Sequence, residues 1–121
     1  MFALRGATTV TEDTKEMVLH ETKILLNEII NKNSLNQEDI ISIIFTATKD
    51  LKSVYPAVAA RELGLVDIGL MCMQEMYVEG SLGKCIRVLM YINKNDKPHH
   101  VYLNGSKKLR PDLCKEEGGG Q

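Results

Sequence analysis

The spacing of apolar residues predicts one long amphipathic helix near the start of the chain. Between residues 13 and 31 the apolar positions recur as one face of a helix requires. That face is formed by Val18, Leu19, Thr22, Leu25, Leu26, Ile29 and Ile30. Asp13 is followed three residues later by Glu16, which fits the positions of a capping box. The sequence therefore predicts a helix over residues 13–31 with one face packed on a core.

Shorter apolar and β-branched runs predict five strands, over residues 2–10, 40–47, 67–73, 85–92 and 100–103. The run over 40–47 is continuously apolar, which favours a strand covered on both faces. Residues 56–63 are predicted to form a short helix, because Pro56 suits the first helical position and Gly64 suits the position after the end. Segments 70–76 and 84–90 are interpreted as two apolar strands flanking a turn, as in a hairpin.

The order of these elements, β-α-β-α-β-β-β, predicts one α/β (α+β) domain over residues 1–114. We expect a mixed sheet of about five strands with two helices on one face. The other face of such a sheet needs cover, and the simplest cover is another copy of the chain in a closed ring. Residues 115–121 are polar and glycine-rich, and are predicted to form a disordered tail.

Composition narrows the function classes. The formal net charge of -1 argues against a nucleic-acid-binding platform and against a polybasic membrane surface. Neither an apolar run long enough to span a membrane nor a signal peptide ahead of Arg5 is found, so we expect a cytoplasmic protein. The 3 cysteines include no CxxC pair, which argues against a disulfide framework and against a zinc site. We therefore predict no metal site.

Two charged residues interrupt the apolar strands. Arg87 is surrounded by apolar neighbours, and Glu75 ends the preceding apolar run. A charge on a buried strand is costly unless an opposite charge meets it. Either the two residues form a salt bridge that closes the hairpin, or their partner is a small charged substrate. Arg5, beside Gly6, is either a further contact for an anion or an arginine at the rim of the sheet. Cys72 is either a small buried side chain or a nucleophile, although it lacks a nearby histidine.

Five segments, taken together and in order, resemble the monofunctional chorismate mutases of the trimeric α/β type. They are RGATTV (residues 5–10), CMQEM (72–76), KCIRV (84–88), HVYL (100–103) and LRPDL (109–113). The resemblance implies a homotrimeric pseudo-barrel with active sites between neighbouring chains. It implies the concerted Claisen rearrangement of chorismate to prephenate, on the way to phenylalanine and tyrosine, without a cofactor or a nucleophile.

The resemblance also implies the roles of individual residues. Arg87 would meet the ether oxygen, Glu75 the ring hydroxyl, and Cys72 the same hydroxyl region. Arg5 and Tyr102 would hold the side-chain carboxylate. The remaining substrate-binding residues form the cleft wall or raise the local positive potential: Tyr55, Ala57, Met71, Met73, Gln74, Arg61, Leu109 and Arg110. The chain departs from the family pattern at Tyr55, Val58 and Met71, where phenylalanine, lysine and threonine are usual.

Two other functions remain open from the sequence. One is a trimeric deaminase acting on small enamines or imines, in which Glu75 would serve as the base. The other is a trimeric protein that binds a small dicarboxylate without converting it.

Overall fold

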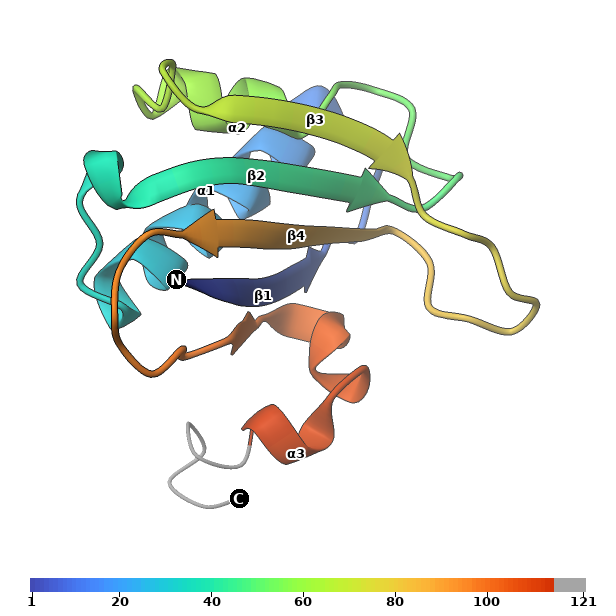
Figure 1. Cartoon of the computed structure of the whole chain (residues 1–121). Coiled ribbons are helices and arrows are strands. Elements are labelled where there is room, and N and C mark those ends of the chain that lie inside the picture. Colours follow the sequence, from blue (N-terminus) through green and yellow to red (C-terminus); the bar gives the residue numbers. More distant parts are fainter. Residues whose placement is uncertain (115–121) are drawn as a thin grey trace.

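The computed structural model describes residues 1–114 of the chain. Its strands are β1 (Phe2–Thr9), β2 (Ile40–Ala47), β3 (Gly69–Gln74), β4 (Cys85–Ile92) and β5 (Val101–Tyr102). Its helices are α1 (Lys15–Lys32), α2 (Ala57–Glu62) and α3 (Pro111–Cys114), with two short 3₁₀ helices, η1 (Gln37–Asp39) and η2 (Asn104–Lys108). All five strands lie in one mixed sheet (Figure 1), which confirms the predicted fold class.

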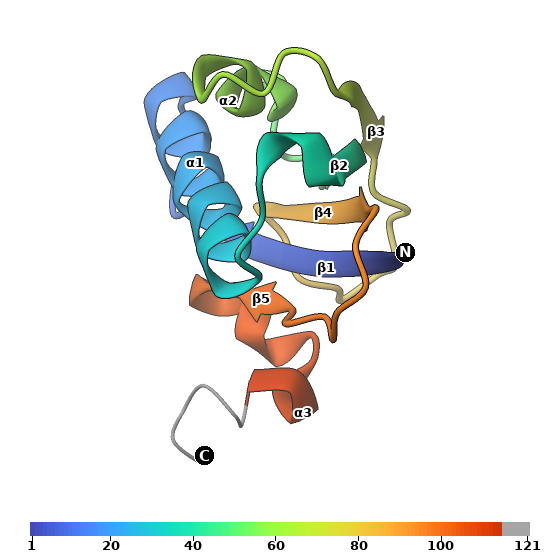
Figure 2. The same ribbon diagram turned by 60° about the vertical axis from the view of Figure 1, so that its left-hand side comes forward.

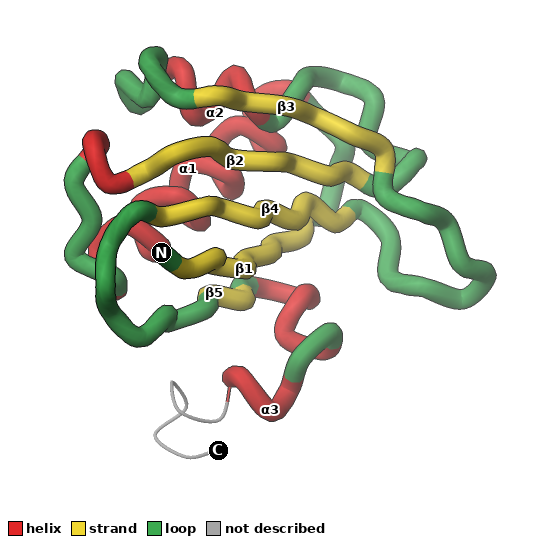
Figure 3. The backbone as a smooth tube through the Cα atoms, viewed as in Figure 1, coloured by secondary structure: helices red, strands yellow, loops and turns green. Residues whose placement is uncertain are grey.

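The strand order is β3-β2-β4-β1-β5. β4 is antiparallel to both β1 and β2, whereas β3 pairs with β2 and β5 pairs with β1 in parallel. The predicted hairpin of residues 70–76 and 84–90 is therefore wrong, because β2 lies between β3 and β4 (Figure 3). The physical reason is that β2, α2 and β3 form a parallel crossover unit, which places β3 at the outer side of β2.

Helices α1 and α2 cover one face of the sheet (Figure 2). The core between the layers is made of fully buried aliphatic and aromatic side chains: Leu4, Leu25, Leu26, Ile29, Ile43, Phe45, Met90 and Ile92. At Gly6 the helix comes so close that an added Cβ would lie 2.7 Å from Cδ1 of Ile29. The glycine in β1 thus marks a close approach of α1.

The start of α1 differs from the prediction. Thr14 is the N-cap, and its Oγ1 accepts a hydrogen bond from the backbone N–H of Met17 at 3.1 Å. The carboxylate of Asp13 instead accepts from the backbone N–H groups of Lys52 at 2.8 Å and Ser53 at 3.2 Å. These bonds stabilise the charged carboxylate and hold the pKa of Asp13 below its usual value. Asp13 therefore ties the chain before α1 to the loop that leads from β2 to α2.

The second face of the sheet, which we call the open face, has no helix over it (Figure 2). Within this chain β2 is consequently covered on one face and not on both. Met71 and Met73 of β3 lie on the open face and are 58% and 47% exposed. Two neighbouring apolar side chains are thus left exposed at this sheet surface.

The segment after β5 folds back on β1. The backbone N–H of Leu103 and the hydroxyl of Ser106 both donate to the carbonyl of Ala7, at 2.9 and 2.8 Å. The sequence predicted neither η2 nor α3. The predicted disordered tail, 115–121, lies outside the described residues. None of the helices in residues 1–114 has the length and apolar character to cross a membrane.

Candidate active site

One row of paired residues crosses the open face and contains Arg87. In this row Met73 pairs with Thr46, Thr46 with Arg87, and Arg87 with Ala7. Ala7 in turn pairs with Tyr102 of β5. Directly paired residues present their side chains on the same face of a sheet. The fold therefore brings Tyr102 and Arg87, which come from different sheet strands, to the same surface.

Arg5 lies in the next row, where it pairs with Leu89. The two rows line a pocket of about 400 Å³, which we call the Arg87 pocket. Its polar walls are Arg5, Thr46, Glu75, Arg87 and Tyr102. Two guanidinium groups against one carboxylate leave the pocket with an excess of positive charge, which suits an anionic ligand.

Glu75 is held from three directions. Its backbone N–H donates to the carbonyl of Ala47 at 2.9 Å, which extends the pairing of β3 with β2 by one residue. Its Oε1 accepts from Oγ1 of Thr46, and its Oε2 accepts from Nη1 of Arg87 at 3.4 Å. The salt bridge considered from the sequence is thus present, but it passes over β2 and does not close a hairpin. The Arg87 side chain is 43% exposed, so its remaining N–H groups can meet a ligand.

Arg5 is contacted by His100, which comes directly before β5. The backbone N–H of Arg5 donates to Nδ1 of His100 at 3.0 Å, and Nη2 of Arg5 lies 3.5 Å from Nε2 of the same ring. Burial lowers the pKa of His100, and the positive charges of Arg5, Arg110 and His99 act in the same direction. His100 belongs to the HVYL segment, although no role is predicted for it from the sequence.

A second group of predicted residues lines a different pocket at the sheet edge, of about 550 Å³, which we call the edge pocket. Tyr55, Cys72, Met73 and Gln74 lie here. Cys72 pairs with Phe45, a core residue, and packs toward the helices. Its side chain therefore lies on the opposite face of β3 from Met73, which lines both pockets.

Three further predicted residues, Ala57, Arg61 and Met71, do not line the Arg87 pocket. Ala57 is 5% exposed and packs in the core between α2 and the sheet. Arg61 is exposed near the end of α2. Met71 of β3 is exposed on the open face, in the same row as Arg5.

A third pocket, of about 340 Å³, lies beneath the loop between β3 and β4, and we call it the loop pocket. It shares Glu75 and Arg87 with the Arg87 pocket, and Leu109 lines it. Nζ of Lys49 lies 3.7 Å from the centre of the Tyr77 ring, a cation–π contact that holds this loop.

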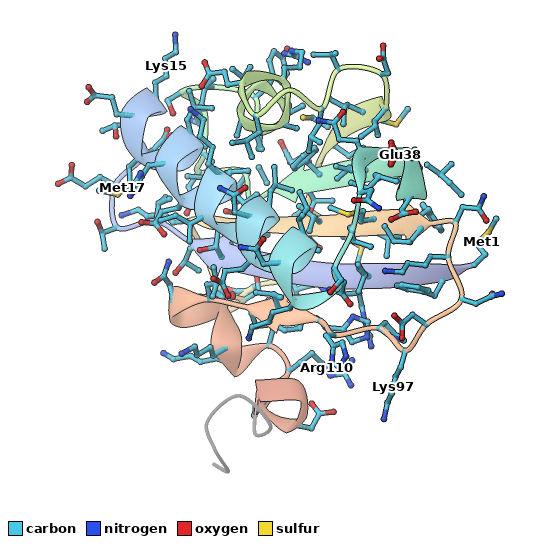
Figure 4. The ribbon with its side chains drawn as sticks, turned by 90° about the vertical axis from the view of Figure 1, so that its left-hand side faces the viewer. Met1, Lys15, Met17, Glu38, Lys97 and Arg110 are labelled. Carbon is cyan, nitrogen blue, oxygen red and sulfur yellow. The ribbon has the colours of Figure 1, made fainter. Side chains whose placement is uncertain are left out.

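Arg110 follows Leu109 at the approach to α3 (Figure 4). Its guanidinium donates two hydrogen bonds to the carboxylate of Asp112, at 2.8 and 3.1 Å. This pairing was not predicted. It holds the arginine side chain beside its own segment.

Sequence reasoning missed Thr46 and His100, each of which contacts a predicted site residue. Thr46 is recognised only from the strand register, which places it opposite Arg87. In residues 1–114, no three His, Cys, Asp or Glu side chains are grouped in a way that would hold a metal ion.

Comparison with known proteins identifies the family. Residues 1–113 match the family model described as chorismate mutase type I. The chain is 48% identical over 114 residues to the chorismate mutase AroH of Bacillus subtilis (strain 168), covering 91% of this chain and 90% of that protein. It is 42% identical over 114 residues to the chorismate mutase AroH of Thermus thermophilus, covering 91% and 93%.

A solved structure of the chorismate mutase from Clostridium thermocellum is also similar. It matches with a TM-score of 0.88 and 51% sequence identity, over 89% of this chain and 99% of that one. The family-model match spans residues 1–113 and therefore includes both rows of the Arg87 pocket. The chain belongs to the chorismate mutase type I family.

Proposed function

We propose that this chain converts chorismate to prephenate in the Arg87 pocket, by stabilising charge and holding the substrate in a folded conformation. The observation that carries the proposal is the convergence of Arg5, Glu75, Arg87 and Tyr102 on this pocket, from four different segments of the chain. Membership of the chorismate mutase family supports this activity over the deaminase and the dicarboxylate-binding protein.

The chemistry of the rearrangement explains why these residue types are useful. In the transition state the ether bond stretches, negative charge grows on its oxygen, and the ring gains positive character. A guanidinium beside the oxygen, supplied by Arg87, lowers the barrier by about 3–4 kcal/mol in comparable sites. The Glu75 carboxylate binds the ring hydroxyl and favours the positive ring.

The substrate is a dianion, and the pocket matches it. Arg5 and Tyr102 are proposed to hold the side-chain carboxylate. Leu109, which lines the adjoining loop pocket, and Arg110, which follows it in the chain, are proposed to add an apolar wall and positive potential. Holding the flexible ether in its reactive fold is a proximity effect and needs neither a cofactor nor a covalent intermediate.

We further propose that the site is completed by a neighbouring copy of the chain. The second group of predicted residues is separated from the Arg87 pocket in this chain: Tyr55, Cys72 and Gln74 line the edge pocket, and Ala57 and Arg61 lie on α2. Tyr55 is 71% exposed, and Met71 and Met73 are exposed on the open face. A closed ring of three copies would cover these side chains and bring the edge pocket of one copy to the Arg87 pocket of the next.

The cytoplasmic location, the absence of nucleic-acid and membrane partners, and the extent of the catalytic domain over residues 1–114 stay predictions of the sequence.

The direct test of the activity is to mix the purified protein with chorismate and to follow the loss of its ultraviolet absorbance, with prephenate identified as the product. A deaminase or a simple binding protein leaves chorismate unchanged in this assay, so unchanged absorbance rejects the proposed function.

The test of the shared site is complementation between two defective variants. Arg87→Ala damages the Arg87 pocket, and the double variant Tyr55→Ala/Arg61→Ala damages the second group. When the two are co-expressed with different tags and the mixed oligomers isolated, each mixed ring of three has about one site in three with two intact halves. Activity well above that of either variant alone is expected. If the mixed oligomers are no more active than the two variants measured separately, the Arg87 pocket and the second group of residues do not meet between copies.

A further inference from the structure

We propose that His100 is a positioning residue for Arg5, whose backbone N–H it holds through Nδ1 so that the guanidinium stays at the Arg87 pocket. The inference deepens the proposed function and rests on the role that it gives to Arg5. His100 does not itself line the pocket among the described residues, so its effect on the substrate is transmitted through Arg5.

The strand geometry explains why a side chain is needed here. β5 pairs with β1 only at Gly6 and Ala7, through Val101 and Tyr102. The N–H of Arg5 lies one residue before this short ladder, where β5 has not yet begun. The imidazole Nδ1, 3.0 Å from that N–H, replaces the missing strand partner. A hydrogen bond at this position fixes the backbone from which the Arg5 side chain departs.

The bond also defines the protonation state of the ring. Since Nδ1 accepts a hydrogen bond, the neutral imidazole carries its hydrogen on Nε2. Nε2 lies 3.5 Å from Nη2 of Arg5, and both atoms then carry hydrogens, so this contact is not a hydrogen bond. The His100 ring therefore lies beside the Arg5 guanidinium without accepting a hydrogen bond from it. The N–H donors of the guanidinium stay available to an anion.

Protonation of His100 would undo the arrangement. A protonated ring has no lone pair on Nδ1 and adds a positive charge beside Arg5 of β1, Arg110 before α3 and the neighbouring His99. Burial and these same cations keep the folded-state pKa below its ordinary value of about 6.5. The bond is thus intact at neutral pH and is lost as the pH falls through the lowered folded-state pKa. Because the unfolded chain binds more protons in this window, stability rises with pH up to about 6.5 and is flat above it.

The test compares two substitutions with a matched control. His100→Leu removes the acceptor, whereas His100→Asn places an amide oxygen near the position of Nδ1 and does not titrate. The control is His99→Leu, because His99 is the exposed neighbouring histidine. At pH 8 we expect His100→Leu to raise the KM for chorismate about tenfold with a smaller change in kcat, as for loss of one hydrogen bond that orients a charged group. His100→Asn and His99→Leu should stay within about twofold of wild type.

The pH profile separates positioning from a purely structural role. Wild-type kcat/KM is expected to decline as the pH falls through the folded-state pKa of His100, which lies below its ordinary value, and this part of the decline should be absent in His100→Asn. A wild-type KM in His100→Leu, or an unchanged acid decline in His100→Asn, would overturn the proposal.

An NMR measurement keeps the inference separate from the activity. The ¹⁵N shifts of His100 should show the Nε2–H form at pH 8, and the Arg5 amide signal should move when the ring is protonated. An Nδ1–H form overturns the inference whatever the activity is. If the NMR signals are as expected but the wild-type protein does not turn over chorismate, the proposed function is rejected. The hydrogen bond from Arg5 to His100 then has no role in catalysis.

Discussion

Thr46 donates a hydrogen bond from Oγ1 to Oε1 of Glu75, although the residues are 29 positions apart in the chain. Thr46 is in β2 and pairs directly with Arg87 of β4, whose Nη1 lies 3.4 Å from the second carboxylate oxygen. The carboxylate is therefore fixed between a neutral hydroxyl and a cation. The ion pair with Arg87 is long and partly exposed, which weakens it relative to the hydrogen bond from Thr46. The orientation of Glu75 accordingly depends more on the hydroxyl than on the guanidinium.

Replacing Thr46 by valine tests this dependence. Thr46→Val keeps the shape of the side chain but removes the donor, and a hydrogen bond to a charged group contributes about 1.5–3 kcal/mol. Because Glu75 is 26% exposed and water can replace the donor in part, we expect the lower end of this range, or about a tenfold loss of kcat. The measurement is steady-state turnover of chorismate at pH 8.

Thr46→Ser is the matched control, since it keeps the hydroxyl and loses one methyl group. Its kcat should remain within about threefold of wild type. Equal losses in the two variants would mean that packing at β2, and not the hydrogen bond, sets the position of Glu75.

Arg87 is expected to supply the largest single contribution to the rate. Arg87→Ala should lower kcat by about 10²–10³-fold, the usual effect of removing one donor from a developing negative charge. Arg87→Lys keeps the charge but not the planar fork of donors, so it should recover only part of the loss. Turnover is measured together with the oligomeric state by gel filtration, so that a folding defect is recognised.

Lys23→Ala provides the control for loss of an ion pair as such. Lys23 pairs with Glu62 at 2.6 Å on the helical side of the molecule. Its removal should leave kcat unchanged. If Arg87→Ala turned over chorismate as fast as Lys23→Ala does, the proposed mechanism would be wrong.

The strands that the sequence predicted most closely are those decided by local residue pattern. The predicted bounds 40–47 and 85–92 agree with β2 and β4, because both are long runs rich in β-branched and other apolar residues. The pairing of strands was harder to predict. Segments 70–76 and 84–90 are close in sequence, which favours a hairpin, yet the parallel crossover through α2 inserts β2 between them. Nothing in the two segments themselves contains that information.

The candidate site shows the same division. Family resemblance pointed to Arg5, Glu75, Arg87 and Tyr102, and the fold brings these four to one pocket. The residues that hold them are specified by register: Thr46 is recognised only when β2 is aligned with β4. His100 reaches Arg5 across 95 positions, because β5 begins one residue too late to pair with it. Such contacts depend on where strands begin and end, and sequence patterns predict strand boundaries poorly.

Gly6 is expected to be intolerant of any side chain. Besides Ile29, a Cβ at this position would lie 3.1 Å from the carbonyl oxygen of Val101 and 3.1 Å from Cγ2 of Val88. The backbone oxygen cannot move without disturbing the pairing of β1 with β5. Overpacking of this kind costs about 1–3 kcal/mol, so Gly6→Ala should lower the midpoint of urea denaturation.

Ile29→Val provides a check on the cause, because it removes the methyl group that lies nearest to the added Cβ. The double variant should be more stable than the sum of the two single effects predicts. Strict additivity would mean that the contact with α1 is not what Gly6 protects.

The two thiols at the pockets should react at very different rates. The pKa of the Cys85 thiol is raised to about 11, chiefly by burial, with Glu75 and Asp50 acting in the same direction and Arg87 acting against them. At pH 8 the thiolate fraction of Cys85 is therefore about 10⁻³, and alkylation by iodoacetamide should be slow. Cys72 is partly exposed at the edge pocket and should react first.

The experiment uses Cys114→Ser, so that these two thiols alone are followed by mass spectrometry, with and without denaturant. If the edge pocket of one copy faces the Arg87 pocket of the next, excess prephenate should also slow the labelling of Cys72. Rapid labelling of Cys85 in the folded protein would contradict its burial. Labelling of Cys72 at the same rate with and without prephenate would instead place this cysteine away from the bound product and count against the shared site.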